Sequence, residues 1–250
     1  MGYDSALKEV IKNIILGLVV ILISAYLIGA AIWFSTQPKQ TICSAIEWVI
    51  DDSWERQYVT SEELTNMINH TNLNPAGKAV DDILTQAIEA CVMLHPMVRK
   101  AQCFVTTQGR VIVRLTQRVP LLGVRTESSS YYIDTDRLHM PASGRITTPV
   151  IWAVGKTDDH LAKTVLADMV EWLQCHSYWE NRIERIEVRN DRNIVLVDSS
   201  STRIIVGDGQ EFESKMFKLR LFEEQMEKVG NGNTYKELDL RYKDQVIGKE

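Results

Sequence analysis

The chain of 250 residues lacks most of the patterns that mark nucleic-acid binding, cofactor binding and hydrolysis. Its formal net charge is −5 and its Lys and Arg residues are not clustered, which argues against a nucleic-acid partner. It has no Gly-rich phosphate loop ending in lysine and no G-x-S-x-G motif of a serine hydrolase. Its four cysteines and five histidines do not have the spacing of zinc ligands. We therefore expect no metal, no cofactor and no nucleic acid to be bound.

One segment has what the rest of the chain lacks, a long apolar run without charge. It covers residues 14–34, and a helix of this length reaches about 30 Å, the thickness of the hydrocarbon core of a bilayer. The apolar core of a cleaved signal peptide is only about 7–15 residues long, so we expect a retained transmembrane helix. Lys8 and Lys12 lie in the short tail 1–13, and the positive-inside rule places this tail in the cytoplasm and the rest of the chain outside.

The cysteines leave two interpretations open. In an oxidising compartment they could form disulfides, and the sequence does not choose among the possible pairings. The apolar neighbours of Cys43, Cys91 and Cys103 instead favour buried thiols. The fourth cysteine is Cys175.

Residues 41–117 are expected to form one unit with the order strand, helix, helix, strand, strand. Thr60 and Glu63 have the spacing of a capping box, which predicts that the first helix begins here. Pro96 cannot continue a helix and ends the second one. The predicted elements are a strand over 42–50, a helix from Ser61, a helix from Asp81 or Asp82 to His95, and strands over 98–106 and 110–117. The second helix is expected to bury Ile83, Leu84, Ala87, Ile88, Cys91 and Val92.

Residues 118–250 are expected to form a larger domain rich in strands, starting after Arg118-Val119-Pro120 ends the preceding strand. The predicted elements are strands over 131–134, 149–154, 183–188, 194–197 and 203–206, a helix over 157–173, a helix ending near Lys228, and a closing strand over 235–247. The last helix is expected to bury Phe212, Met216, Leu219, Met226 and Val229. The fold class is therefore α+β, with a single N-terminal transmembrane helix, a βααββ unit and a mixed α/β domain that ends in an edge strand.

Four stretches give this order of elements a more specific meaning. They are Ile88-Glu89 with His95-Pro96-Met97-Val98 and Ala101, Val113 to Pro120 (VRLTQRVP), Val206-Gly207 with Phe212, Lys215 and Leu219, and Tyr235 to Tyr242 (YKELDLRY) followed by Gln245-Val246-Ile247. In their order and spacing they resemble the FtsQ/DivIB family of bacterial cell-division proteins. The resemblance covers almost everything after Phe34, and it implies a POTRA-like domain over 41–117 and an FtsQ-type β-domain over 118–250.

The resemblance implies a scaffold rather than an enzyme. Such a protein is a bitopic inner-membrane component of the divisome that recruits or regulates septal cell-wall synthesis. Its N-terminus is expected in the cytoplasm, its C-terminal bulk in the periplasm, and the whole protein at the division septum. Its expected partners are FtsB/FtsL-like division proteins, bound through the C-terminal β-domain, and other divisome components, bound through the POTRA-like domain.

The resemblance also implies which segment binds the partner, and the physics of strands supports it. A terminal strand can leave N–H and C=O groups unpaired, and an extended segment of a partner can add to them. Tyr242 is the expected anchor, because amphipathic rings are frequent hot spots. The alternative interpretation is that Leu238 and Leu240 are ordinary core residues. The expected partner-binding residues are Tyr235, Leu238, Asp239, Leu240, Arg241, Tyr242, Gln245, Val246 and Ile247.

Two other functions stay open from the sequence. The first is a periplasmic, membrane-anchored component that uses a POTRA-type module for peptide binding or transport, and that would not need the closing segment. The second is an anchored peptidase of the Ser–Lys or Ser-His-Asp type. Ser35 lies near the membrane exit without a recognisable motif, and Ser44 falls in a predicted strand, so the peptidase is the weaker of the two.

Overall fold

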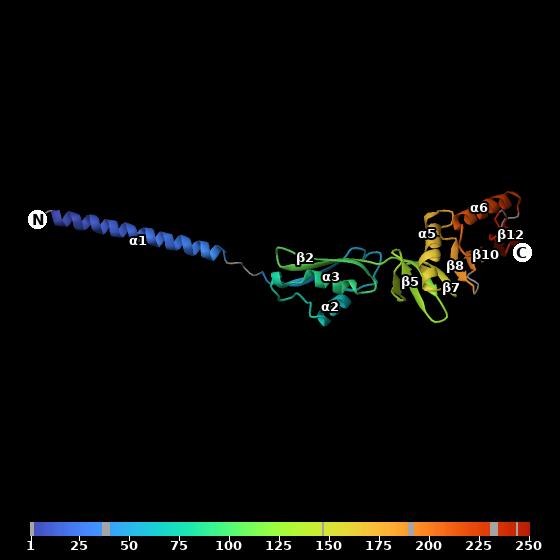
Figure 1. Cartoon of the computed structure of the whole chain (residues 1–250), viewed down its shortest axis with the longest axis horizontal. Helices are drawn as coiled ribbons and strands as arrows, with labels where there is room; N and C mark the ends of the chain where they lie inside the picture. The colour runs from blue at the N-terminus through green and yellow to red at the C-terminus, as the bar shows by residue number, and fades with distance from the viewer. Residues whose placement is uncertain (1–2, 37–40, 147, 190–192, 231–234, 244) are drawn as a thin grey trace.

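The computed structural model describes the whole chain except residues 1–2, 37–40, 147, 190–192, 231–234 and 244. Three parts follow one another along the long axis of the molecule (Figure 1). The first is helix α1 (Tyr3–Thr36). Within it the stretch Lys12–Trp33 has a mean hydropathy of 2.7 and no buried residue, so it is long and apolar enough to cross a membrane. The predicted apolar helix is confirmed.

The second part is a three-stranded sheet with two helices on one face (Figure 1). Its strand order is β1-β3-β2, with β1 parallel and β2 antiparallel to the central strand β3. This is the predicted βααββ order. The elements are β1 (Ala45–Ile50), α2 (Ser61–His70), a 3₁₀ turn (Val80–Asp82), α3 (Thr85–Met93), β2 (Val98–Val105) and β3 (Arg110–Gln117).

The predicted start is confirmed for one of the two helices and wrong for the other. At α2 the capping box is confirmed, because the Glu63 N–H donates to Thr60 Oγ1 (3.3 Å) and the Thr60 N–H donates to Glu63 Oε2 (3.2 Å). The predicted start of the second helix at Asp81 or Asp82 is wrong. Residue Ile83 has extended backbone angles (φ −81°, ψ 116°), which separate the 3₁₀ turn from α3. Leu84 therefore precedes the helix and is exposed rather than part of its buried face.

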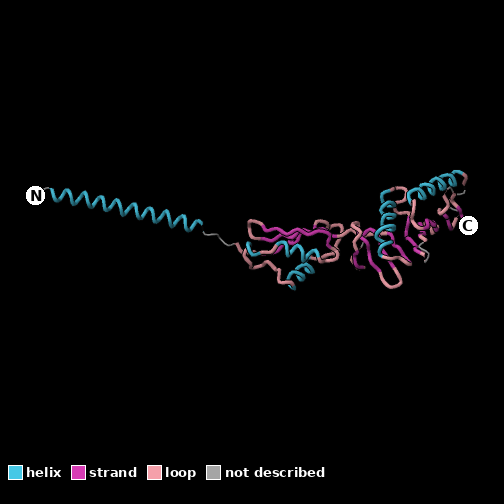
Figure 2. Tube along the Cα trace, viewed as in Figure 1, coloured by secondary structure: helices cyan, strands magenta, loops and turns pink. Residues whose placement is uncertain are grey.

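The third part is a nine-stranded sheet with helices on one face (Figure 2). Its strand order is β12-β11-β10-β9-β8-β7-β4-β5-β6. The strands are β4 (Pro120–Arg125), β5 (Ser130–Asp134), β6 (His139–Pro141), β7 (Ile151–Gly155), β8 (Ile183–Val188), β9 (Ile194–Asp198), β10 (Arg203–Gly207), β11 (Glu237–Asp239) and β12 (Ile247–Lys249). The helices are α4 (Asp159–Leu161), a π-helical turn (Ala162–Leu166), α5 (Ala167–Cys175) and α6 (Phe212–Lys228).

Strand β4 was not among the predicted elements. Pro120 was expected to end the preceding strand, and instead it begins β4, a position where proline is tolerated because it needs no ladder donor. The residues from Pro120 to Val124 are all buried, so the strand shows no polar–apolar alternation. Such alternation is what predicts a half-buried strand from the sequence, so β4 could not be predicted in this way.

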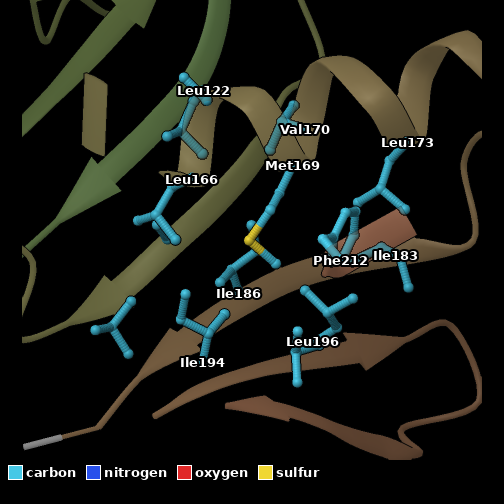
Figure 3. Close-up of a cluster of buried hydrophobic side chains, with 14 of the residues drawn as sticks. Leu122, Leu166, Met169, Val170, Leu173, Ile183, Ile186, Ile194, Leu196 and Phe212 are labelled. Carbon is cyan, nitrogen blue, oxygen red and sulfur yellow. The ribbon is translucent and has the colours of Figure 1, made fainter. Parts of the chain in front are cut away.

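The core of the third part lies between its sheet and helices α5 and α6 (Figure 3). Met169 of α5 points toward Ile186 of the sheet, and Leu173 of α5 points toward Ile183. From α6, Phe212, Met216 and Leu219 are buried as predicted. The prediction for Val229 is wrong, because this residue follows the end of α6 and is exposed.

The second and third parts share a packed junction. Tyr132 and Met140 of the large sheet belong to the hydrophobic cluster of the βααββ unit. Tyr58 Oη and Thr148 Oγ1 are hydrogen-bonded (2.5 Å), and Arg145 Nη1 lies 2.7 Å from Glu63 Oε1. These contacts join the two parts beyond their covalent connection.

His95 at this junction is expected to make the fold sensitive to acid. Burial lowers the pKa of His95, Glu63 raises it and Arg145 lowers it, and the net shift is downward. Its Nδ1 also accepts the Met97 N–H (3.3 Å), which requires the neutral ring. The unfolded chain therefore binds a proton more readily than the folded chain. We expect the free energy of unfolding to fall as the pH decreases from about 7.5 to about 5.5.

The measurement is chemical unfolding of the full chain in detergent at both pH values. His95→Gln should reduce this pH dependence, whereas His160→Gln, at an exposed histidine, should leave it as in the wild type. An unchanged pH dependence in His95→Gln would contradict the assignment.

Candidate partner-binding site

The C-terminal end of the large sheet is built from two short strands rather than one long strand. The predicted closing strand over 235–247 is wrong in this respect. Strand β11 pairs in parallel with β10, and β12 then folds back antiparallel to β11. Strand β12 is the outermost strand of the sheet, so the predicted C-terminal edge strand is confirmed and falls on residues 247–249.

A lysine of α6 accounts for the break between the two strands. Lys218 Nζ donates to the carbonyl oxygens of Leu240 and Lys243 (3.4 Å each) and also to that of Tyr242. The Leu240 N–H still donates to Ile205 O (2.9 Å), so the chain leaves β10 directly after this residue. Three carbonyls drawn toward one ammonium group cannot continue a straight strand, and the chain turns.

Four of the predicted site residues have roles inside the protein. Leu238 and Leu240 are buried in the core beneath α6, as the alternative interpretation had it. Asp239 is buried and accepts hydrogen bonds from the Arg241 guanidinium, from Nη2 to Oδ2 (2.6 Å) and from Nε to both Oδ1 (2.9 Å) and Oδ2 (3.2 Å). These hydrogen bonds from Arg241 lower the pKa of the Asp239 carboxyl and outweigh burial, which raises it.

The other predicted residues lie closer to the surface. Tyr242 is 50% exposed and Ile247 is 37% exposed. Gln245 is exposed, and Val246 is half-buried against the core. Tyr242, Gln245 and Ile247 are therefore exposed to an incoming chain, and the side chain of Arg241 is also 45% exposed.

The ring of Tyr235 covers the middle residue of the edge strand. A Cβ atom added to Gly248 would lie 2.4 Å from Tyr235 Cδ1, so only glycine fits below this ring. The same ring packs against Phe222 of α6, with 5.9 Å between the ring centroids. Sequence reasoning missed Gly248, because its cover by an aromatic ring depends on the pairing of two strands and leaves no local signal.

The backbone of β12 is open along its outer side. Lys249 O accepts the Lys236 N–H (2.8 Å) and so points inward. Backbone groups alternate in direction along a strand, so the N–H and C=O of Gly248 face outward. Lys249 Nζ also forms an ion pair with Glu237 Oε1 (2.8 Å), and this hydrogen bond raises the pKa of Lys249.

The opposite edge of the large sheet and the edge strand β2 of the small sheet are less open. Strand β6 ends in Pro141, which has no N–H to offer. On β2 the Cys103 N–H is taken by Glu89 Oε1 (2.6 Å). The edge at β12 carries neither feature, so it is more open to strand addition than these two edges.

A metal site has no support in the described part of the chain, where no three His, Cys, Asp or Glu side chains are grouped to hold an ion. Cys43, Cys91 and Cys103 are buried free thiols, whereas Cys175 is exposed.

Comparison with known families agrees with this architecture. Residues 41–116 match a family described as a POTRA-like domain. Residues 119–249, more than half of the chain, match a family described as FtsQ/DivIB, C-terminal related. No curated protein sequence matches the chain. The FtsQ/DivIB family consists of non-enzymatic division proteins, and its two domain types occur here in order behind an apolar helix that is a candidate membrane anchor. The chain therefore belongs to the FtsQ/DivIB family of cell-division proteins.

Proposed function

We propose that the protein is a bitopic inner-membrane scaffold of the bacterial divisome that binds FtsB/FtsL-like proteins through the edge strand β12. The observation that carries the proposal is an outward-facing backbone at Gly248 on the last strand of the sheet. An extended segment of a partner would add to this strand as a tenth strand. The role is recruitment or regulation of septal cell-wall synthesis.

The short edge sets the kind of contact to expect. Strand β12 has three residues, so strand addition supplies few main-chain hydrogen bonds. Side chains must add to the affinity, and two are exposed: Ile247 within β12 and Tyr242 in the turn that precedes it. The partner-binding surface is thus Tyr242, Gln245, Ile247 and the backbone of Gly248. Arg241 lies next to it, while Leu238 and Leu240 support it from within.

We infer the orientation of the protein from the charged residues before its apolar helix. Lys8 and Lys12 precede the apolar run and favour a cytoplasmic N-terminus, with both folded domains in the periplasm. The POTRA-like domain would contact further divisome components. The protein is expected to gather at the division septum, which imaging of a fluorescent fusion in dividing cells would test.

Blocking the edge should abolish partner capture. Gly248→Pro removes the outward N–H, and Gly248→Ala keeps it, while both variants add a Cβ below Tyr235. We expect Gly248→Pro to bind FtsB/FtsL-like proteins of the same cell at least about tenfold more weakly than Gly248→Ala. The measurement is co-purification with the full-length chain from membranes, at matched thermal stability of the two variants. Equal capture by both variants would contradict strand addition at β12.

A further inference from the structure

One face of the large sheet carries a row of side chains that runs straight to the open edge. In the register of the sheet, Arg203 of β10 lies beside Glu237 of β11, and Glu237 lies beside Lys249 of β12. Lys249 Nζ is 2.8 Å from Glu237 Oε1. The row therefore alternates in sign, positive, negative, positive, and it ends on a lysine whose side chain is 65% exposed.

A second row on the same face ends on an apolar residue. Ile205 lies beside Asp239, and Asp239 lies beside Ile247 at the edge. The negative charge in this row is already held by Arg241. The exposed end of the row thus offers the side chain of Ile247 and no free charge of β11.

The other face of β12 offers an aromatic ring. Leu238 beside Gly248 points into the core beneath α6, so Gly248 lies on the helix-covered face. Gly248 has no side chain, and the ring of Tyr235 fills the space above it. A residue placed opposite Gly248 would meet the edge of this ring.

We propose that β12 selects a partner strand by charge and register. The strand it accepts carries an acidic residue opposite Lys249, an apolar or aromatic residue opposite Gly248, and an apolar residue opposite Ile247. The acidic residue continues the alternation of sign across the sheet, and a basic residue there would face Lys249 directly. A slip by one residue would turn the acidic side chain toward Tyr235, so the pattern also fixes the register. This inference rests on the proposed strand addition at β12 and specifies the chemistry of the partner.

Selection from a displayed library tests the pattern without knowledge of the natural partner. Random peptides of roughly 12 residues are selected on the full-length chain in nanodiscs, and peptides that do not bind Gly248→Pro are kept as edge binders. Among these we expect Asp or Glu next to apolar residues. Lys249→Glu should bind such peptides about fivefold more weakly and select Lys or Arg instead. Lys236→Glu makes the same charge change just before β11 and should select as the wild type does.

The outcomes separate the inference from the function on which it rests. Edge binders without an acidic preference, or equal affinities for wild type and Lys249→Glu, would overturn the charge rule and leave strand addition standing. If no selected peptide loses binding in Gly248→Pro, strand addition fails, and the charge rule fails with it. An acidic preference that reverses in Lys249→Glu supports both.

Discussion

Replacing Asp134 by alanine is expected to lower the free energy of unfolding by about 3–5 kcal/mol. The side chain is 1% exposed and accepts hydrogen bonds from Arg118 Nη1 (2.6 Å), the Leu138 N–H (2.7 Å) and the Asp136 N–H (2.9 Å). Arg118 lies between the two folded domains and is itself largely buried. Removal of the carboxylate would leave a buried guanidinium and two amides without their acceptor, so the loss should far exceed that of a surface ion pair.

The neighbouring ion pair provides a matched control. Arg99 and Asp136 are also in contact (2.6 Å), but their side chains are 46% and 37% exposed. Asp136→Ala should therefore cost less than about 1 kcal/mol. Urea unfolding of both full-length variants in detergent gives the comparison. Equal losses in the two variants would show that the buried position of Asp134 does not matter to the junction.

Gly155→Ala is expected to destabilise the large sheet strongly. Gly155 has a φ of +113°, and a Cβ there would lie 2.2 Å from Val188 O of the neighbouring parallel strand. Strands β7 and β8 would have to separate in the middle of the sheet. We expect a loss of about 3–5 kcal/mol from backbone strain and steric overlap together.

Gly230→Ala is a control that separates backbone strain from steric overlap. Its φ of +78° is also positive, but nothing lies within 4 Å of an added Cβ. Gly230→Ala should thus show the backbone strain alone, about 1–2 kcal/mol. The two variants are compared by the same urea unfolding measurement. A loss in Gly155→Ala no larger than that in Gly230→Ala would mean that the sheet adjusts to the methyl group without cost.

The order of elements was predictable wherever a local signal coincided with the fold. Thr60 and Glu63 predict the start of α2, because a capping box is formed by two residues three positions apart and needs no tertiary contact. Strand β4 gave no signal, because it is buried on both faces and so lacks alternation. Strand β4 forms by pairing with β5 and β7, and pairing with another strand leaves no pattern among the neighbouring residues of the sequence.

The candidate site was likewise predictable from local signals only in part. The motif around Tyr235 to Ile247 predicted an edge strand at the C-terminal end of the sheet, but it could not show that Lys218, in a different element, turns the chain after β11. Leu238 and Leu240 are buried in the core before this turn, and the open backbone lies beyond it, at Gly248. Under the proposed strand addition, a partner would therefore meet residues just beyond this motif, above all Gly248 and Lys249.

The unequal ends of the large sheet limit how copies of this protein can associate. A sheet with two receptive ends can stack head to tail into filaments, because each copy offers a donor and an acceptor end. Here Pro141 blunts the end formed by β6, so a neighbouring copy gains little by docking there. If a partner strand adds at β12 as proposed, the sheet then accepts one foreign strand at this end, which favours closed complexes over filaments.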